Sequence, residues 1–272
     1  MTATLPPIVF SHGNSFPAST YRVMLDSLRA RGFEVHAIEK FGHDPLYPVS
    51  NNWPHLVRQL HDFVLPLVQS ADGQAPFLVG HSLGGFLSLM CAAQHPQLAR
   101  GVLLIDSPLL DGWKAGALGL AKHTPLMKRF SPSGVSRRRR EQWSDREAVY
   151  EHFRAKKIFA RWDPQALHDY IDHGTFISGD TRALAFERDV EAAIYDGLPH
   201  NLGALLRSHP LQCPAAFIGG RQSAEMKRVG MAATQRVTQG RISMLDGTHL
   251  FPMEKPLATA AAVEAALRNL LD

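Results

Sequence analysis

Cysteine is scarce in this chain, which has only Cys91 and Cys213 among its 272 residues. Both lie in apolar surroundings, and their separation does not match the spacing of cysteine ligands in a metal site. The sequence therefore predicts two buried free thiols and argues against a zinc site built from cysteines.

Long apolar runs are also missing. No stretch approaches the roughly 20 apolar residues that a membrane-spanning helix needs. The first residues, MTATLPPIVFSHG, have neither a basic start nor an apolar run of signal-peptide length. We therefore expect a cytoplasmic protein without a membrane span. Its apolar fraction of 45% is ordinary for a globular chain.

The excess of positive charge is small, with 29 basic and 25 acidic residues and a net charge of +4. Four of the positive charges stand together in Arg137–Arg140. This run suggests a solvated helix face with ion pairs to residues such as Glu141 and Asp145. Binding of an anionic substrate, such as an acyl-CoA or a phosphoester, is the alternative. Basic and aromatic residues are not spread over a wider surface, so we expect no nucleic-acid partner.

Short apolar runs that alternate with longer amphipathic runs make up most of the chain. Because this alternation is typical of parallel strands joined by helices, it predicts an α/β protein with a parallel sheet flanked by helices. The expected strands cover residues 7–11, 33–38, 76–80, 101–106, 215–219 and 241–245. The expected helices cover residues 19–31, 53–69, 83–94, 224–239 and 257–271, with a bend or an end at Pro66.

The pattern changes between residues 108 and 210, where no comparable apolar strand occurs. We expect this segment to form several helices, most clearly over 137–157 and 164–171. It follows the fourth predicted strand, so residues 1–107 and 211–272 would form the core and residues 108–210 a helical lid. Apolar residues of the lid could line a substrate pocket: Leu109, Leu110, Trp113, Leu118, Met127, Phe130, Phe159 and Phe176.

The stretch VGHSLGGF places Ser82 between a predicted strand and a predicted helix. A strand–Gly-x-Ser-x-Gly–helix turn is the context of a nucleophile elbow, and Gly80 and Gly84 leave room for it. Such a turn raises the hydroxyl above the sheet and brings the backbone N–H of Leu83 beside the attacked carbon. Ser82 is therefore the candidate nucleophile.

A serine nucleophile needs a base and an oxyanion hole. The carboxyl ends of parallel strands share one edge of the sheet, and His249 follows the last predicted strand, so it should meet Ser82 there. HGNS, residues 12–15, follows the first strand and reaches the same edge. The backbone N–H groups of Asn14 and Leu83 could then form the oxyanion hole. His12 would organise the loop.

These motifs resemble the α/β-hydrolase superfamily in its single-domain, lid-bearing branch. The matching stretches, in order, are HGNSF, GHSLGG, LLIDSP, FIGG and DGTHLFPMEKP. The resemblance implies hydrolysis through a serine, a histidine and an acid. HGN also resembles haloalkane dehalogenases, whose nucleophile is an aspartate, so Ser82 argues against that chemistry. The antiparallel strands that usually come first in this fold are expected to be short or absent, which would leave about six parallel strands.

The acid departs from the family pattern. An aspartate is expected about three residues beyond Gly220, where this chain has Ser223. Asp106 ends the fourth strand, a position at which some family members carry their acid. Glu225 lies two residues past the expected site, and Asp246 is close to His249 in sequence. We rank Asp106 first and Glu225 second.

The function that these features favour is a serine hydrolase that cleaves a carboxylic ester with an apolar portion through an acyl-enzyme on Ser82. The same machinery could serve a C–C bond hydrolase, a thioesterase or a lactone hydrolase, or persist in a non-catalytic binding protein. We expect no cofactor. His168, Asp169, Asp172 and His173 could share a helix face, but they lack a dense ligand cluster, so we expect no metal site.

Overall fold

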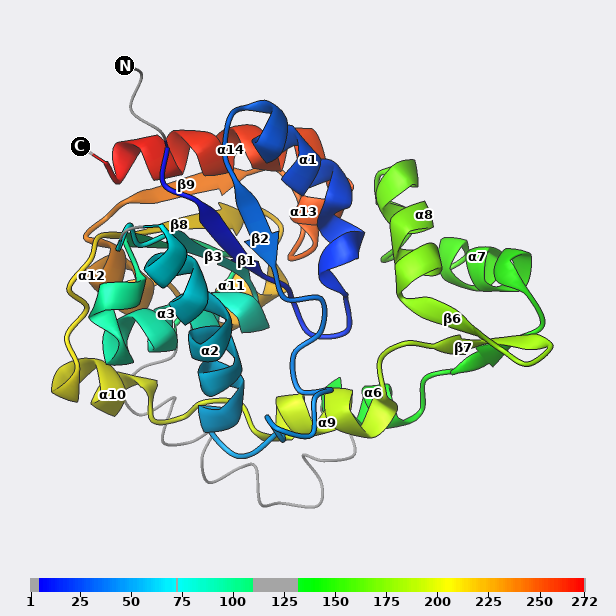
Figure 1. Cartoon of the computed structure of the whole chain (residues 1–272). Coiled ribbons are helices and arrows are strands. Elements are labelled where there is room, and N and C mark those ends of the chain that lie inside the picture. The colour runs from blue at the N-terminus through cyan, green and yellow to red at the C-terminus, as the bar shows by residue number, and fades with distance from the viewer. Residues whose placement is uncertain (1–4, 72, 110–131, 272) are drawn as a thin grey trace.

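A parallel sheet forms the centre of the molecule in this computed structural model, which describes residues 5–71, 73–109 and 132–271 (Figure 1). Its strand order is β2-β1-β3-β4-β8-β9, and every pair is parallel. The expected six parallel strands are therefore confirmed. Their bounds are β1 (Ile8–Ser11), β2 (Val35–Ala37), β3 (Phe77–His81), β4 (Gly101–Ile105), β8 (Ala215–Gly220) and β9 (Ile242–Leu245).

Side chains of the central strands alternate between two apolar cores. In β1, Ile8 and Phe10 join one core, whereas Val9 joins the other. Successive residues of a strand point to opposite faces, so a sheet covered on both sides needs strands that are apolar throughout. This is why these strands read as continuous apolar runs in the sequence.

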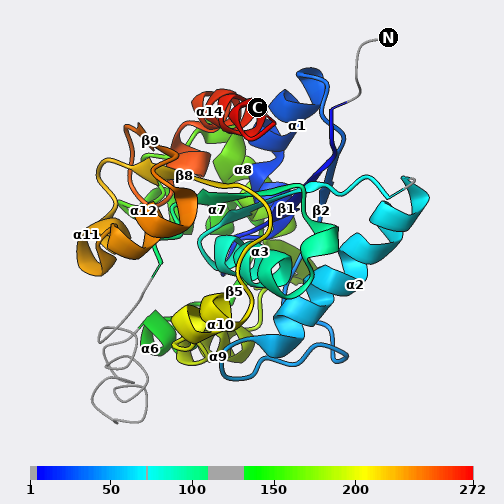
Figure 2. The ribbon, with the colours of Figure 1, turned by 90° about the vertical axis from the view of Figure 1, so that its left-hand side faces the viewer.

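Helices cover both faces of the sheet. Figure 1 shows α1 and α14 above it and α2 and α3 below it, and Figure 2 shows the same layers from the side. The bounds along the core are η1 (Ala18–Tyr21), α1 (Arg22–Ala30), α2 (Pro54–Ser70), α3 (Leu83–Gln94), η2 (Pro96–Leu98), α11 (Ala224–Val229), α12 (Ala232–Thr238), α13 (Phe251–Glu254) and α14 (Pro256–Asn269).

Two of these helices differ from expectation. Helix α2 continues past Pro66 to Ser70, so the proline does not end it. The single helix expected over 224–239 is two helices, α11 and α12, because the chain breaks at Gly230, whose φ is +83°. That conformation is accessible to glycine but ends a right-handed helix.

The inserted segment, residues 108–210, is not purely helical as predicted. Besides its helices it contains a three-stranded antiparallel sheet of order β5-β7-β6. These strands are short and partly polar, so they carry no apolar run that sequence patterning could detect. The bounds are α6 (Pro132–Arg137), β5 (Gln142–Trp143), α7 (Arg146–Arg154), α8 (Pro164–His173), β6 (Thr175–Ser178), β7 (Thr181–Leu184), α9 (Arg188–Asp196) and α10 (Leu202–Ser208).

The helix expected over 137–157 is also wrong. Helix α6 ends at Arg137, β5 intervenes, and α7 begins after Asp145. The Asp145 carboxylate accepts a hydrogen bond from the backbone N–H of Ala148 and so caps the new helix. A capping aspartate therefore marks a helix start at a point where we had predicted a helix interior.

The inserted segment shares an apolar cluster with the core. Trp162 and Tyr170 pack against Phe16, which follows β1. Of the predicted pocket residues, Leu109 and Phe159 are buried and Phe176 is 51% exposed. Five others lie outside the described residues: Leu110, Trp113, Leu118, Met127 and Phe130.

The remaining sequence expectations concern thiols and membranes. Both cysteines are free, but only Cys91 is buried, and Cys213 is half-buried. Cys213 therefore corrects the prediction of two buried thiols. In the part of the chain that the structure describes, no helix is long and apolar enough to cross a membrane.

Candidate active site

Ser82 occupies a strained turn between β3 and α3. Its φ of 52° and ψ of −114° lie outside the regions that non-glycine residues favour. A Cβ atom on Gly80 would overlap the backbone of Gly84, and one on Gly84 would overlap the Ser11 carbonyl. The two glycines of the motif therefore permit the close backbone approach that the turn requires.

His249 lies beside Ser82. It belongs to the turn between β9 and α13, and its Nε2 is 3.0 Å from the Ser82 Oγ. The side chain of His249 is 20% exposed, so the imidazole is shielded but reachable. As expected from the shared edge of a parallel sheet, the turn after β3 and the turn after β9 bring these two residues together.

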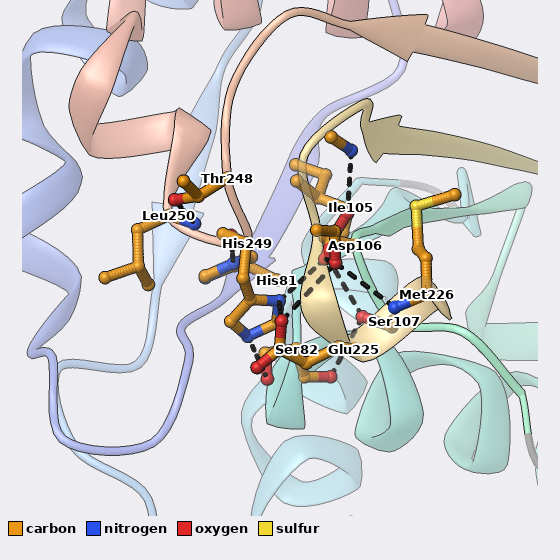
Figure 3. Close-up of polar contacts among 12 residues, drawn as sticks. His81, Ser82, Ile105, Asp106, Ser107, Glu225, Met226, Thr248, His249 and Leu250 are labelled. Atoms are coloured by element: carbon orange, nitrogen blue, oxygen red, sulfur yellow. Dashed lines mark hydrogen bonds and ion pairs between the residues drawn. The ribbon is translucent and has the colours of Figure 1, made fainter. Parts of the chain in front are cut away.

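Asp106 is the carboxylate that meets the other side of the imidazole (Figure 3). Its Oδ2 is 2.7 Å from Nδ1 of His249. Glu225 Oε2 is 3.8 Å from the same nitrogen, beyond hydrogen-bonding distance. Asp246 points elsewhere and accepts hydrogen bonds from Gln222 and Lys255. Of the three carboxylates considered from sequence, Asp106 therefore has the contact.

Asp106 is fully buried and well supplied with donors. Its Oδ1 accepts from the backbone N–H of Gly220 at 2.7 Å, and its Oδ2 accepts from the Ser223 hydroxyl at 2.6 Å. Buried carboxylates require such partners, because an unpaired charge away from water is costly. Because a carboxylate only accepts, the proton of the His249 contact lies on Nδ1, which leaves Nε2 to accept from Ser82.

Two backbone N–H groups belong to the turns that follow β1 and β3. Neither Asn14 nor Leu83 uses its backbone N–H in a hydrogen bond within the described part of the chain. Leu83 is the first residue of α3, where a helix leaves its N–H groups unpaired and concentrates positive dipole charge. The Asn14 side chain is directed away, because its Nδ2 donates to the Glu191 carbonyl at 3.0 Å. This contact uses one of the two Nδ2 hydrogens, whereas the backbone N–H of Asn14 has no partner among the described residues.

His12 is part of the scaffold of this loop. Its Nε2 accepts from the backbone N–H of Phe41 at 3.0 Å, and its Nδ1 lies 2.8 Å from the Gly13 carbonyl. Burial lowers the pKa of His12 from 6.5 to about 4, so the ring is neutral near pH 7. The organising role expected for His12 agrees with these contacts.

Three residues at the site were not identified from sequence. Ser223 occupies the position where an acid was expected and donates to Asp106 instead. His81 lies inside the GHSLGG motif and contacts both Tyr21 and the His249 carbonyl. The motif could have pointed to His81, whereas no sequence pattern distinguishes Tyr21 from the other residues of the helix expected over 19–31.

The candidate metal ligands of the sequence do not come together. Asp169 accepts from Arg22, and Asp172 forms an ion pair with Arg146. Across residues 5–71, 73–109 and 132–271, the one group of three ligand-type side chains is Asp106, Glu225 and His249. Two of these side chains are engaged in their mutual hydrogen bond, and we assign no metal to them.

Three of the four arginines of the run, Arg137, Arg138 and Arg140, are exposed as predicted, but the run does not form a helix face. Arg137 ends α6 and pairs with Asp196, and Arg139 is largely buried between Glu191 and the Tyr170 hydroxyl. The predicted partners Glu141 and Asp145 engage other groups, Arg188 and the N-terminus of α7. The run connects the inserted segment internally.

Comparisons with known proteins agree with this architecture. The sequence profile described as "Alpha/beta hydrolase family" matches residues 8–262. The chain is 31% identical to a pyrethroid hydrolase of Sphingobium wenxiniae over 39% of its own length and 37% of that protein. It is 23% identical to a serine hydrolase-like protein of Dictyostelium discoideum over 91% of its length and 70% of that protein.

A solved structure extends the agreement in fold to almost the whole chain. A peroxisomal alpha-beta-hydrolase of Saccharomyces cerevisiae superimposes with a TM-score of 0.77 at 18% identity, over 99% of this chain and 78% of that one. The curated relatives at 31–32% identity are matched over only 36–37% of their own length.

Proposed function

The chain belongs to the alpha/beta hydrolase family, and from that premise we propose that it is a serine hydrolase that cleaves carboxylic esters through an acyl-enzyme. The observation that carries the proposal is the unbroken series of contacts from Ser82 Oγ to His249 to Asp106, at 3.0 and 2.7 Å. A serine hydroxyl becomes a useful nucleophile when a correctly oriented histidine can take its proton.

In acylation, Ser82 Oγ attacks the ester carbonyl while Nε2 of His249 takes the hydroxyl proton. Asp106 holds Nδ1 protonated, so Nε2 is the basic nitrogen, and its negative charge stabilises the imidazolium that forms. The backbone N–H groups of Asn14 and Leu83 stabilise the oxyanion of the tetrahedral intermediate. His249 then passes its proton to the departing alcohol, and the acyl group remains on Ser82.

In deacylation, water attacks the acyl-enzyme with His249 again as the base, and the acid product leaves with Ser82 restored. Every proton that moves is carried by His249, so the cycle needs no resident cofactor. We propose that residues 108–210 act as a cap over the core formed by residues 1–107 and 211–272. Its apolar side chains favour a substrate with an apolar acyl or alcohol part.

The first test is labelling with a fluorophosphonate followed by mass mapping, on wild type and on Ser82→Ala. The expected result is one labelled peptide that contains Ser82, with no label in Ser82→Ala. Ser208→Ala, which changes an exposed serine on α10, is the matched control and should label like wild type. A panel of p-nitrophenyl esters of increasing chain length then tests ester cleavage. Absence of label in folded wild type would contradict the proposal.

A further inference from the structure

A buried series of hydrogen bonds runs behind the proposed nucleophile. The Tyr21 hydroxyl lies 3.0 Å from the backbone nitrogen of Gly13 and 2.7 Å from Nδ1 of His81. On its other side, Nε2 of His81 lies 2.9 Å from the backbone carbonyl of His249. His81 directly precedes Ser82 at the end of β3. The series therefore links three loops of the site through one imidazole.

The direction of each bond follows from chemistry. A carbonyl only accepts, so Nε2 of His81 carries a proton and donates to His249. Burial lowers the pKa of His81 from 6.5 to about 3, so the ring is neutral and Nδ1 must accept. The Tyr21 O–H therefore donates to Nδ1, and the Tyr21 oxygen accepts from the Gly13 N–H. Burial also raises the pKa of Tyr21, which keeps its hydroxyl protonated.

Packing around Gly13 is independent evidence that the three groups fit closely. A Cβ atom on Gly13 would lie 2.8 Å from Nδ1 of His81 and 3.0 Å from the Tyr21 hydroxyl, closer than ordinary contacts. Glycine is therefore required at position 13 because the Tyr21–His81 pair occupies the space that a side chain would need.

The two loops at the ends of the series are not held together by the sheet. Gly13 follows β1, and His249 follows β9, whereas three other strands lie between β1 and β9 in the sheet order. Gly13 precedes Asn14, a proposed oxyanion donor, and the His249 backbone carries the proposed base. Contacts above the sheet edge therefore add to what the sheet itself fixes, and the series through His81 is such a contact.

We propose that Tyr21 and His81 are positioning residues that hold the oxyanion loop and the base loop at a fixed distance from Ser82. This inference rests on the proposed function. Catalysis of this kind depends on the placement of donors and base, and a shift of about 1 Å can cost roughly 100-fold in rate. Neither residue is expected to touch substrate, so the loss should appear in kcat.

The test is Tyr21→Phe, which removes only the hydroxyl. We expect kcat for a p-nitrophenyl ester to fall about 10- to 100-fold, while KM changes less than about 3-fold. Tyr47→Phe is the matched control, because its hydroxyl also forms a side-chain hydrogen bond, to Asp62 at 2.9 Å, but contacts none of the site residues. Tyr47→Phe should keep the wild-type kcat and KM.

His81→Asn and His81→Gln separate the two halves of the series. The asparagine oxygen can take the place of Nδ1 as acceptor for Tyr21, and the glutamine nitrogen can take the place of Nε2 as donor to His249. Each should retain more activity than His81→Leu, which preserves neither contact. Tyr21→Phe added to His81→Gln should cost less than about 2-fold further, since that variant already lacks the Nδ1 acceptor.

A purely structural role predicts different data. It would lower the melting temperature of Tyr21→Phe but leave kcat per folded molecule unchanged. If kcat does fall in both single variants, independent roles of the two residues would make these losses multiply in the double variant. Either result overturns the proposal. If Tyr21→Phe does not fold, kcat per folded molecule is compared among His81→Asn, His81→Gln and His81→Leu, and equal values in all three overturn the proposal. If wild-type Ser82 does not react with the fluorophosphonate, the proposed function fails first, whereas reactive wild type with a normal Tyr21→Phe defeats only the positioning role.

Discussion

Oδ2 of Asp106 lies 2.7 Å from Nδ1 of His249, although 143 positions separate the two residues in sequence. Asp106 directly follows β4, and its φ of 44° is in the left-handed region that non-glycine residues rarely adopt. This backbone conformation accompanies a carboxylate that is fully buried and directed at the histidine. The acid contact thus comes from the strand beside β3 and not from the loop after β8.

The contact predicts unequal effects for two carboxylates near His249. Asp106→Asn should lower kcat by about three to four orders of magnitude, because an amide no longer fixes the proton on Nδ1. Glu225→Gln, a matched change 3.8 Å from the same nitrogen, should keep kcat within about 3-fold. Steady-state kinetics on a p-nitrophenyl ester, with circular dichroism to establish folding, measure both. The reverse order of effects would assign the acid to Glu225.

Ser223 provides a second prediction, because its hydroxyl donates to Asp106 at 2.6 Å and accepts from the N–H of Met226 at the start of α11. Ser223→Ala removes one of the donors of a buried carboxylate and a helix cap, so it should lower the free energy of unfolding by about 1–3 kcal/mol. We expect kcat to fall about 10-fold as Asp106 loses its fixed orientation. Urea denaturation and ester kinetics measure the two effects.

Ser223→Thr is the control, because it retains the hydroxyl. It should remain closer to wild type than Ser223→Ala in both stability and kcat. If the two variants behave alike, the volume of the side chain matters and the bond to Asp106 does not.

The sequence predicted the site best where a reactive residue type also follows a strand of the parallel sheet. Ser82 and His249 follow different strands, and the shared edge of a parallel sheet is enough to expect them to meet. The choice of Asp106 was harder, because the turns after three different strands each offered a carboxylate that could contact His249. Their distances depend on loop conformation, including the positive φ of Asp106, and no local pattern encodes that.

The inserted segment was the least predictable part. Strand β6 exposes Phe176 and Ile177 and continues into a turn at Gly179, so it lacks the apolar run of a buried strand. Tyr21 is buried in the apolar core, and its hydroxyl also reaches the site. A buried ring whose hydroxyl also contacts a site residue depends on packing between distant segments, and the spacing of apolar residues along the chain does not reveal such a contact.

Two buried histidines predict loss of stability in mild acid. The pKa of His81 is lowered to about 3 and that of His12 to about 4, from an ordinary value of 6.5, in both cases mainly by burial. Between the pKa of each folded histidine and the ordinary value of 6.5, the unfolded chain binds more protons than the folded one. The contribution of each neutral ring to the free energy of unfolding is therefore fully present above about pH 6.5 and is lost as the pH falls. Each histidine should lower the free energy of unfolding by about 2 kcal/mol at pH 5 relative to neutral pH.

Urea denaturation at pH 7 and pH 5 measures this loss. His81→Gln removes one of the two groups, so its difference between pH 7 and pH 5 should be smaller than that of wild type by about 2 kcal/mol. Equal stability of wild type at the two pH values would contradict the neutral assignment of both rings.

The buried ion pair between Arg139 and Glu191 predicts a large stability effect inside the inserted segment. Their side chains are 16% and 3% exposed, and Glu191 also accepts from the Ser136 hydroxyl. Arg139→Met would leave a carboxylate buried without its cation, which typically costs about 3–5 kcal/mol. Arg137→Gln is the matched control. It breaks an ion pair with Asp196 whose side chains are 41% and 35% exposed, so about 1 kcal/mol or less is expected.

The same pair lies next to the proposed oxyanion loop, because the Glu191 backbone carbonyl accepts from the Asn14 side chain. Arg139→Met should therefore lower kcat as well as stability, whereas Arg137→Gln should change neither appreciably. Adding Glu191→Leu to Arg139→Met removes the unpaired charge and should recover part of the lost stability. If the double variant is no more stable than Arg139→Met, packing around Arg139, and not the buried charge, accounts for the loss.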